Sequence, residues 1–173
     1  MSVTESRGSV RINGRDCVPF GINSGVRQGD GLSPILFNIA IEEALQSVAE
    51  RDLGVEVGAK LNILAFADDV VIFAESVDDL RSLTRLFMSE AEKVGLKTND
   101  AKTKYMHFRR NQNQRGGLLQ IDGHVFEQVE NFKYLGVTIS NKNTDEPEIQ
   151  NRINSANRCV YACNRILSTK SLS

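Results

Sequence analysis

Two long segments of the chain repeat their hydrophobic residues at helical spacing. The first stripe lies between Ser33 and about Arg51 and comprises Leu36, Phe37, Ala40, Ile41, Ala44, Leu45 and Val48. The second lies between Asp78 and Val94 and comprises Leu80, Leu83, Leu86, Phe87 and Ala91. Stripes of this width are typical of helices that pack against other elements. The pattern therefore predicts two amphipathic helices that cover a sheet.

Residues at the ends of these segments indicate where the two helices begin and end. Ser33 precedes Pro34, the order expected of an N-cap and a first helical residue whose missing N–H costs nothing. Ser76 is the candidate cap of the second helix, and Gly95 is its candidate C-terminal stop.

Shorter segments have the apolar runs or the alternation of β-strands. Residues 63–74 read ILAFADDVVIFA, so they predict a hairpin from about Lys60 to Glu75 with Asp68 and Asp69 at its tip. Asn13-Gly14 is a strong hairpin turn signal, and residues 1–8 are expected to fray. The other strand candidates are residues 10–12, 17–22, 97–98, 103–108, 118–121, 125–129 and 132–139.

A third helical pattern runs from about Glu148 to Leu167, with Ile149, Ile153, Ala156, Val160, Cys163 and Leu167 on one face. Cys159 and Cys163 share a face, and we expect them to pack in the core. Zinc is disfavoured because His107 and His124 lack the spacing of ligands. Together the elements predict an α+β fold, with helices packed on one face of an antiparallel sheet and a further helix after it.

Composition bounds the class of protein and its surroundings. With 173 residues, of which 40% are hydrophobic, the chain is long enough for one globular domain. The absence of a secretory or membrane-spanning run gives no reason to expect a membrane partner. Three cysteines suit free thiols in a reducing compartment, so we expect an intracellular protein, nuclear or cytoplasmic.

The net charge of −1 hides an uneven distribution along the chain. Residues 42–92 carry twelve acids and four bases, a net of −8, whereas residues 93–117 carry seven bases and one acid, a net of +6. The basic residues are Lys93, Lys97, Lys102, Lys104, Arg109, Arg110 and Arg115. This basic block is either a solvated surface or a contact for the backbone of a nucleic acid or a triphosphate.

Two segments carry candidate chemistry. Asp68 and Asp69 place two like charges in one turn, and charges about 4 Å apart repel by roughly 4 kcal/mol near a protein surface. A divalent cation such as Mg²⁺ would remove that repulsion. Upstream, residues 25–38 (GVRQGDGLSPILFN) describe a polar, glycine-containing loop that enters a helix N-terminus, a geometry suited to phosphate. Taken alone, each segment is more typical of an ordinary turn or loop than of a functional site.

Taken together, these segments resemble the palm of reverse transcriptases. GVRQGDGLSPILFN is similar to the substrate-contacting motif B, and FADD at 66–69 is similar to the metal-binding motif C. GLKTNDAKTK at 95–104 resembles motif D, and FKYLGVTIS at 132–140 resembles motif E, the primer-grip hairpin. The residues of the first two motifs favour the non-LTR (LINE-like) retrotransposon branch of the family. A group II intron maturase is a weaker alternative.

The resemblance implies RNA-directed DNA synthesis by two-metal nucleotidyl transfer. The implied partners are an RNA template, a DNA primer, deoxynucleoside triphosphates and the rest of a retrotransposon polyprotein. Asp68 and Asp69 would bind Mg²⁺, with Mn²⁺ as an alternative, and Asp68 is the better direct ligand. Lys102 would donate a proton to pyrophosphate. Gln28, Gly29 and Phe66 would border the nucleotide and the metal hairpin, and Tyr134, Leu135 and Gly136 would hold the primer end.

One part of the family pattern has no match in these residues. The family's first metal-binding aspartate lies in motif A, upstream of motif B, but the acids before Gly25 are Glu5 and Asp16, and neither lies on a suitable strand. We therefore expect residues 1–140 to form a partial palm without motif A or fingers, and residues 141–173 to form a linker and the start of a thumb helix.

This departure leaves two functions open. The chain is either an enzyme fragment that is inactive by itself, or a decayed, non-catalytic fragment that at most binds nucleic acid or a partner.

Overall fold

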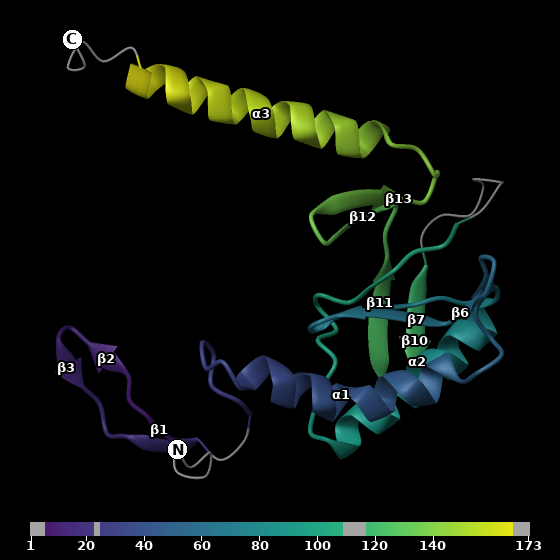
Figure 1. Cartoon of the computed structure of the whole chain (residues 1–173), viewed down its shortest axis with the longest axis horizontal. Coiled ribbons are helices and arrows are strands. Elements are labelled where there is room, and N and C mark those ends of the chain that lie inside the picture. Colours follow the sequence, from purple (N-terminus) through teal and green to yellow (C-terminus); the bar gives the residue numbers. More distant parts are fainter. Residues whose placement is uncertain (1–5, 23–24, 109–116, 168–173) are drawn as a thin grey trace. The chain divides into compact units, whose positions relative to one another are not determined.

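The computed structural model describes residues 6–22, 25–108 and 117–167 of the chain, and Figure 1 shows its elements. The described elements divide into two compact units, which lie within residues 1–97 and 98–173. Arg109, Arg110 and Arg115 of the basic block lie outside the described residues. The predicted boundary near residue 140 stays a prediction.

The first unit begins with paired short strands. β1 (Ser6–Gly8) pairs antiparallel with β4 (Phe20–Ile22), and β2 (Arg11–Ile12) pairs with β3 (Arg15–Asp16). The turn between β2 and β3 is Asn13-Gly14, in which both residues have positive φ, as the turn dipeptide predicts. The prediction that residues 1–8 fray is wrong for residues 6–8, because the ladder with β4 satisfies their backbone.

The helix α1 (Ser33–Ala49) begins where the sequence predicts, but its cap differs. Leu32, and not Ser33, occupies the N-cap position, and Pro34 lies in the first turn. The Ser33 hydroxyl instead donates a hydrogen bond to the carbonyl of Arg27 (2.5 Å). The serine therefore ties the preceding loop to the helix rather than capping it.

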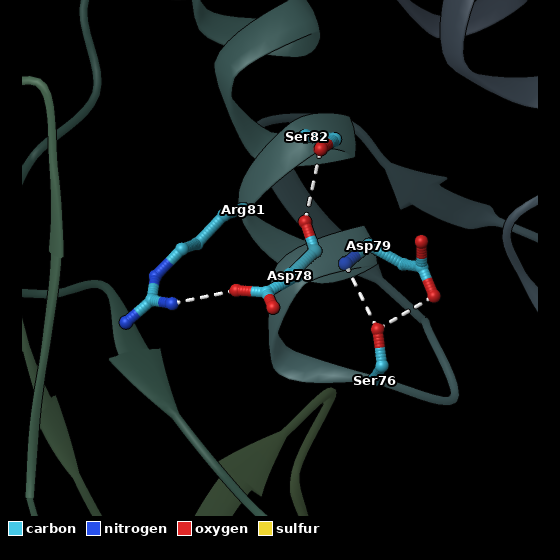
Figure 2. Close-up of polar contacts among 5 residues, drawn as sticks. All are labelled: Ser76, Asp78, Asp79, Arg81 and Ser82. Atoms are coloured by element: carbon cyan, nitrogen blue, oxygen red, sulfur yellow. Dashed lines mark hydrogen bonds and ion pairs between the residues drawn. The ribbon is translucent and has the colours of Figure 1, made fainter.

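The second helix, α2 (Val77–Lys93), is capped at both ends as predicted. The Ser76 hydroxyl accepts a hydrogen bond from the Asp79 amide (3.1 Å) and donates one to its carboxylate (2.6 Å), as Figure 2 shows. At the other end Gly95 has φ of 79°, and the amides of Gly95 and Leu96 donate to the carbonyls of Glu92 and Ala91. These two bonds form a Schellman motif, which the glycine allows.

Between the helices lie two hairpins. β5 (Val55–Glu56) pairs with β6 (Lys60–Leu61), and β7 (Ile63–Phe66) pairs antiparallel with β8 (Asp69–Ile72). The helices pack on each other, and α1 also contacts β7 while α2 contacts β8. The buried apolar residues of this unit are Ile41, Ala44, Val48, Leu83 and Ala91, which come from the two predicted stripes.

The packing of the hairpin differs from the pattern in one respect. Strand alternation leads us to expect Leu64 or Phe66, and Val71 or Phe73, to pack beneath the helix that begins at Ser33. Leu64 and Phe66 are instead exposed, by 46% and 64%, whereas Val71 and Phe73 are half-buried. The expectation is therefore wrong for Leu64 and Phe66, because the described residues do not cover that side of β7.

The second unit is built on β10 (Leu118–Ile121) and β11 (His124–Gln128), which pair antiparallel. β9 (Lys104–Tyr105) joins β11 in parallel, with Lys104 opposite Glu127. The predicted strand at 103–108 is therefore shorter than expected and not antiparallel, and residues 97–98 are not a strand. Leu119, Ile121 and Phe126 form the buried apolar core of this sheet.

The unit ends with β12 (Asn131–Tyr134), β13 (Val137–Ser140) and α3 (Glu146–Leu167). These two strands form an antiparallel hairpin, so the single strand expected at 132–139 is wrong. α3 contacts β13. Cys159 and Cys163 are exposed on α3, so their predicted place in the core is wrong; the described chain packs nothing on that part of the helix. None of the helices in the described residues is long and apolar enough to cross a membrane.

The architecture is mixed α and β, as predicted, with three helices and small, mainly antiparallel sheets among the described residues. The predicted single antiparallel sheet is not observed there; the strands form separate hairpins and one three-stranded sheet. This arrangement is compatible with a palm-like fold.

Candidate active site

The two adjacent carboxylates lie at the tip of the β7–β8 hairpin, as the sequence predicts. Asp68 is in the turn, and Asp69 is the first residue of β8, opposite Phe66. Both aspartates are exposed, and neither carboxylate has a hydrogen bond or ion pair with another described residue. The carboxylates are therefore available to a ligand from solvent.

This donor set fits a divalent cation that is shared with a substrate. In the described part of the chain, no three His, Cys, Asp or Glu side chains gather into a metal site. Mg²⁺, however, is typically bound through one or two carboxylates plus substrate phosphates, and Asp68 and Asp69 can supply that number. Metal ligation by these residues stays a prediction.

The turn beside the carboxylates holds a strained residue. Ala67 has φ of 53°, in the left-handed region that costs an L-residue roughly 1–2 kcal/mol. Backbone strain of this kind is concentrated at functional sites. Here the left-handed conformation of Ala67 reverses the chain within two residues, so that Asp69 pairs with Phe66.

We expect Ala67→Gly to raise the free energy of unfolding by about 0.5 kcal/mol, because glycine relieves the left-handed strain but loses more backbone entropy on folding. Urea unfolding measures this change. Ala65→Gly, in the adjacent strand, is the matched control and should lower stability. Equal losses at both positions would show that Ala67 is not strained.

Asn62 joins the base of this hairpin to the end of α1. Its side chain is 3% exposed, and its amide donates to the carbonyls of Val48 (2.8 Å), Ala49 (3.1 Å) and Arg51. The backbone carbonyl of Asn62 accepts a hydrogen bond from the Phe73 amide (2.8 Å). One residue therefore binds carbonyls at and just beyond the C-terminus of α1, and it closes the hairpin that begins with the next residue. No pattern in the sequence identified this residue.

The loop before α1 is held by its own polar groups. The Asp30 amide donates to the carbonyl of Arg27 (3.3 Å) across a turn in which Gly29 has φ of 88°. The Asp30 carboxylate accepts from the Leu32 amide (3.0 Å). Gln28 and Gly29 are consequently exposed at the corner of a fixed turn, which enters the N-terminus of α1. Their contact with a nucleotide stays a prediction, as does that of Phe66.

Lys102 lies in the second unit, in a turn closed by Asn99. The Lys102 amide donates to the backbone (3.1 Å) and side-chain (3.2 Å) oxygens of Asn99, and the Thr103 amide donates to the same carbonyl (2.9 Å). The Lys102 side chain is exposed and unpaired among the described residues. Lys104, in contrast, forms an ion pair with Glu127 (2.8 Å), which lowers the pKa of that carboxyl.

The predicted primer-grip residues form the turn of the β12–β13 hairpin. Leu135 and Gly136 have φ of 48° and 85°, and both are exposed, while Tyr134 is half-buried at the end of β12. α3 is fixed to this hairpin because the Glu148 carboxylate accepts from the Thr138 amide (2.7 Å). The hydrogen bond from Arg152 and that from Thr138 lower the pKa of Glu148. Primer contact stays a prediction.

Comparison with known proteins decides the family. Residues 2–139 match the family described as reverse transcriptase (RNA-dependent DNA polymerase). The chain belongs to this family. The match spans all four motifs except the last residue of the motif E segment.

Relatives within the family identify the branch. The chain is 26% identical over 159 residues to the retrovirus-related Pol polyprotein from the type-1 retrotransposable element R2 of Popillia japonica. It is 33% identical over 125 residues to that of the type-2 element R2DM of Drosophila melanogaster, and 47% identical over 64 residues to that of the type-1 element R2 of Nasonia vitripennis. R2 elements are non-LTR retrotransposons, so the predicted branch of the reverse transcriptase family is confirmed.

These alignments also define how much of a relative the chain represents. They cover 87%, 67% and 36% of this chain, but 26%, 12% and 6% of the respective relatives. The chain therefore spans about a quarter of the length of the Popillia japonica Pol polyprotein, and less of the other two.

Proposed function

We propose that the chain is the part of an R2-like reverse transcriptase domain that carries one half of the metal site and the contacts to nucleotide and primer. The observation that carries this proposal is the exposed Asp68–Asp69 pair on a hairpin that packs against α1, inside the segment that matches the family. The helix that contacts the hairpin also begins at the loop with Gln28 and Gly29. A palm-like arrangement of the helices on the sheet is part of the proposal.

The proposed reaction is RNA-directed DNA synthesis. The 3′-hydroxyl of a DNA primer attacks the α-phosphate of a deoxynucleoside triphosphate, a new P–O bond forms, and the bond to pyrophosphate breaks. Mg²⁺, or Mn²⁺ in its place, would stabilise the charge on the attacking and leaving oxygens when bound. Asp68 would hold the metal directly, and Asp69 would support it through its charge.

The remaining residues would act on the substrates. Gln28 and the backbone at Gly29 would border the incoming nucleotide, and Phe66 would support the hairpin tip. Tyr134, Leu135 and Gly136 would hold the primer end, and α3 would follow the duplex by its shape. Lys102 would donate a proton to the leaving pyrophosphate. An RNA template, a DNA primer and further parts of a Pol polyprotein would be the partners, inside the cell.

The chain of 173 residues alone should not extend a primer in Mg²⁺. The reason is that motif A, which supplies another metal-binding aspartate in the family, has no match in these residues. Incorporation of labelled nucleotide on a primed RNA template measures this. Robust extension by residues 1–173 would show that the third carboxylate lies among them.

The completed polypeptide, defined as residues 1–173 preceded by an upstream segment with the motif A aspartate, separates the enzyme from a non-catalytic binding module. We expect it to extend a primer on an RNA template. Binding of primed template without any extension would favour the non-catalytic alternative and contradict the proposed function.

Lys102→Ala in the completed polypeptide should slow single-turnover incorporation by ~10²-fold, the lower end of general-acid catalysis, with little loss of nucleotide affinity. Lys104→Ala should cost much less, because that ammonium is already paired with Glu127. Rapid-quench kinetics measure both. Equal small losses would indicate simple attraction of phosphate and remove the catalytic role of Lys102.

A further inference from the structure

A histidine outside the predicted site holds the turn that carries Lys102. His124 Nδ1 lies 2.8 Å and 2.9 Å from the two carboxylate oxygens of Asp100, which is in the same turn as Lys102. Because a carboxylate only accepts hydrogen bonds, Nδ1 carries the hydrogen. His124 therefore donates to Asp100 across 24 residues of sequence. Lys102 and His124 belong to the same compact unit.

The imidazole of His124 packs against a buried side chain of the same strand. His124 is the first residue of β11, and its ring is stacked on Phe126, with the planes 8° apart and the centroids 6.2 Å apart. Phe126 is 2% exposed and lies in the core of the sheet. Residues two apart on a strand share a face, so the ring is oriented by a side chain that is itself fixed.

β11 holds the chain on both sides of Lys102, but by different means. On the C-terminal side, β9 is bound through the backbone ladder, with Lys104 opposite Glu127. That ladder does not depend on any side chain. On the N-terminal side, Asp100 is bound through the side chain of His124. Removing the imidazole should therefore release Asp100, on the N-terminal side of the turn, while β9 on the C-terminal side stays paired with β11.

We infer that His124 is a positioning residue for the Lys102 turn, acting through Asp100. The inference rests on the proposed role of Lys102, but its structural step can be tested separately. The matched variants are His124→Ala, which removes the donor, and His124→Asn, whose side-chain amide can donate from nearly the same position as Nδ1.

Amide hydrogen exchange on the 173-residue chain tests the structural step. In His124→Ala the amides of Lys102 and Thr103 should exchange about fivefold faster, the factor expected for loss of one partly exposed, charge-assisted hydrogen bond. His124→Asn should restore slow exchange. Arg152→Gln, which removes an exposed ion pair elsewhere in the unit, is the control and should leave these amides unchanged. Unchanged exchange in His124→Ala would overturn the inference.

Single-turnover kinetics on the completed polypeptide test the functional step. His124→Ala should lower the incorporation rate about tenfold, since small misplacement of a catalytic group is costly, with nucleotide affinity retained and the rate restored in His124→Asn. Added to Lys102→Ala, it should cost nothing more. If Lys102→Ala slows the reaction and His124→Ala does not, the inference fails and the proposed function stands. If Lys102→Ala has no effect on the rate, Lys102 has no catalytic role, and the functional step inferred for His124 fails with it.

Discussion

Asp68→Asn should abolish Mg²⁺-dependent primer extension by the completed polypeptide, with a loss of about 10³-fold or more. Asparagine keeps the shape of the side chain but removes the charge that binds the metal. It also removes the repulsion between Asp68 and Asp69, so stability without metal should stay level or rise. Rapid-quench incorporation measures the rate, and thermal unfolding measures the stability.

The control for this change is Glu43→Gln, which removes one negative charge from the exposed surface of α1. It should leave extension unchanged. If Asp68→Asn kept a near-normal rate, the aspartate pair would be an ordinary turn and the metal assignment would be wrong. If Asp68→Asn unfolded the chain, the hairpin would depend on the carboxylate in a way that its exposure does not indicate.

The second large effect concerns the joint between α1 and the hairpin. Gly54 is buried, and a Cβ at this position would lie well within 3.0 Å of Asn62 Oδ1 and of the Leu61 carbonyl oxygen. Neither neighbour can move freely, because one is backbone and the other belongs to a side-chain amide whose Nδ2 donates to carbonyls at and just beyond the end of α1. We expect Gly54→Ala to lower the free energy of unfolding by about 2–4 kcal/mol.

Urea unfolding of the chain measures the effect of Gly54→Ala. The matched control is Gly31→Ala, where an added Cβ meets nothing within 4 Å and φ is not positive, so stability should change by less than about 0.5 kcal/mol. A similarly small change at Gly54 would mean that the contact between Asn62 and the residues around it is looser than the structure shows.

The elements that depend on local pattern could be predicted from the sequence. The apolar runs on both sides of Asp68 and Asp69 define the hairpin and place the carboxylates at its tip. Helical spacing defines α1 and α2, and Ser76 and Gly95 mark the ends of α2 because capping involves residues close in sequence. The same locality explains the turn at Asn13-Gly14, whereas the turn at Leu135-Gly136 falls inside the single strand expected at 132–139.

Features that depend on long-range contacts could not be predicted. The parallel pairing of β9 with β11, the Asn62 contacts with α1 and the His124–Asp100 bond all join residues that no local pattern connects. Exposure is also a tertiary property: Cys163 lies on the apolar stripe of α3, but the described chain does not cover that stripe. The Ser33 hydroxyl bonds to Arg27 because the loop folds back on the helix, which spacing does not reveal.

The central claim is that Asp68 and Asp69 hold a divalent metal. Its most direct test is a titration with Mn²⁺ in which electron paramagnetic resonance spectroscopy measures the bound metal. The sample is the completed polypeptide with primed template and a deoxynucleoside triphosphate, as wild type, Asp68→Asn and Glu43→Gln. We predict at least tenfold weaker Mn²⁺ binding in Asp68→Asn and unchanged binding in Glu43→Gln, as expected when a charged ligand is lost. Equal Mn²⁺ affinity in wild type and Asp68→Asn would contradict the account.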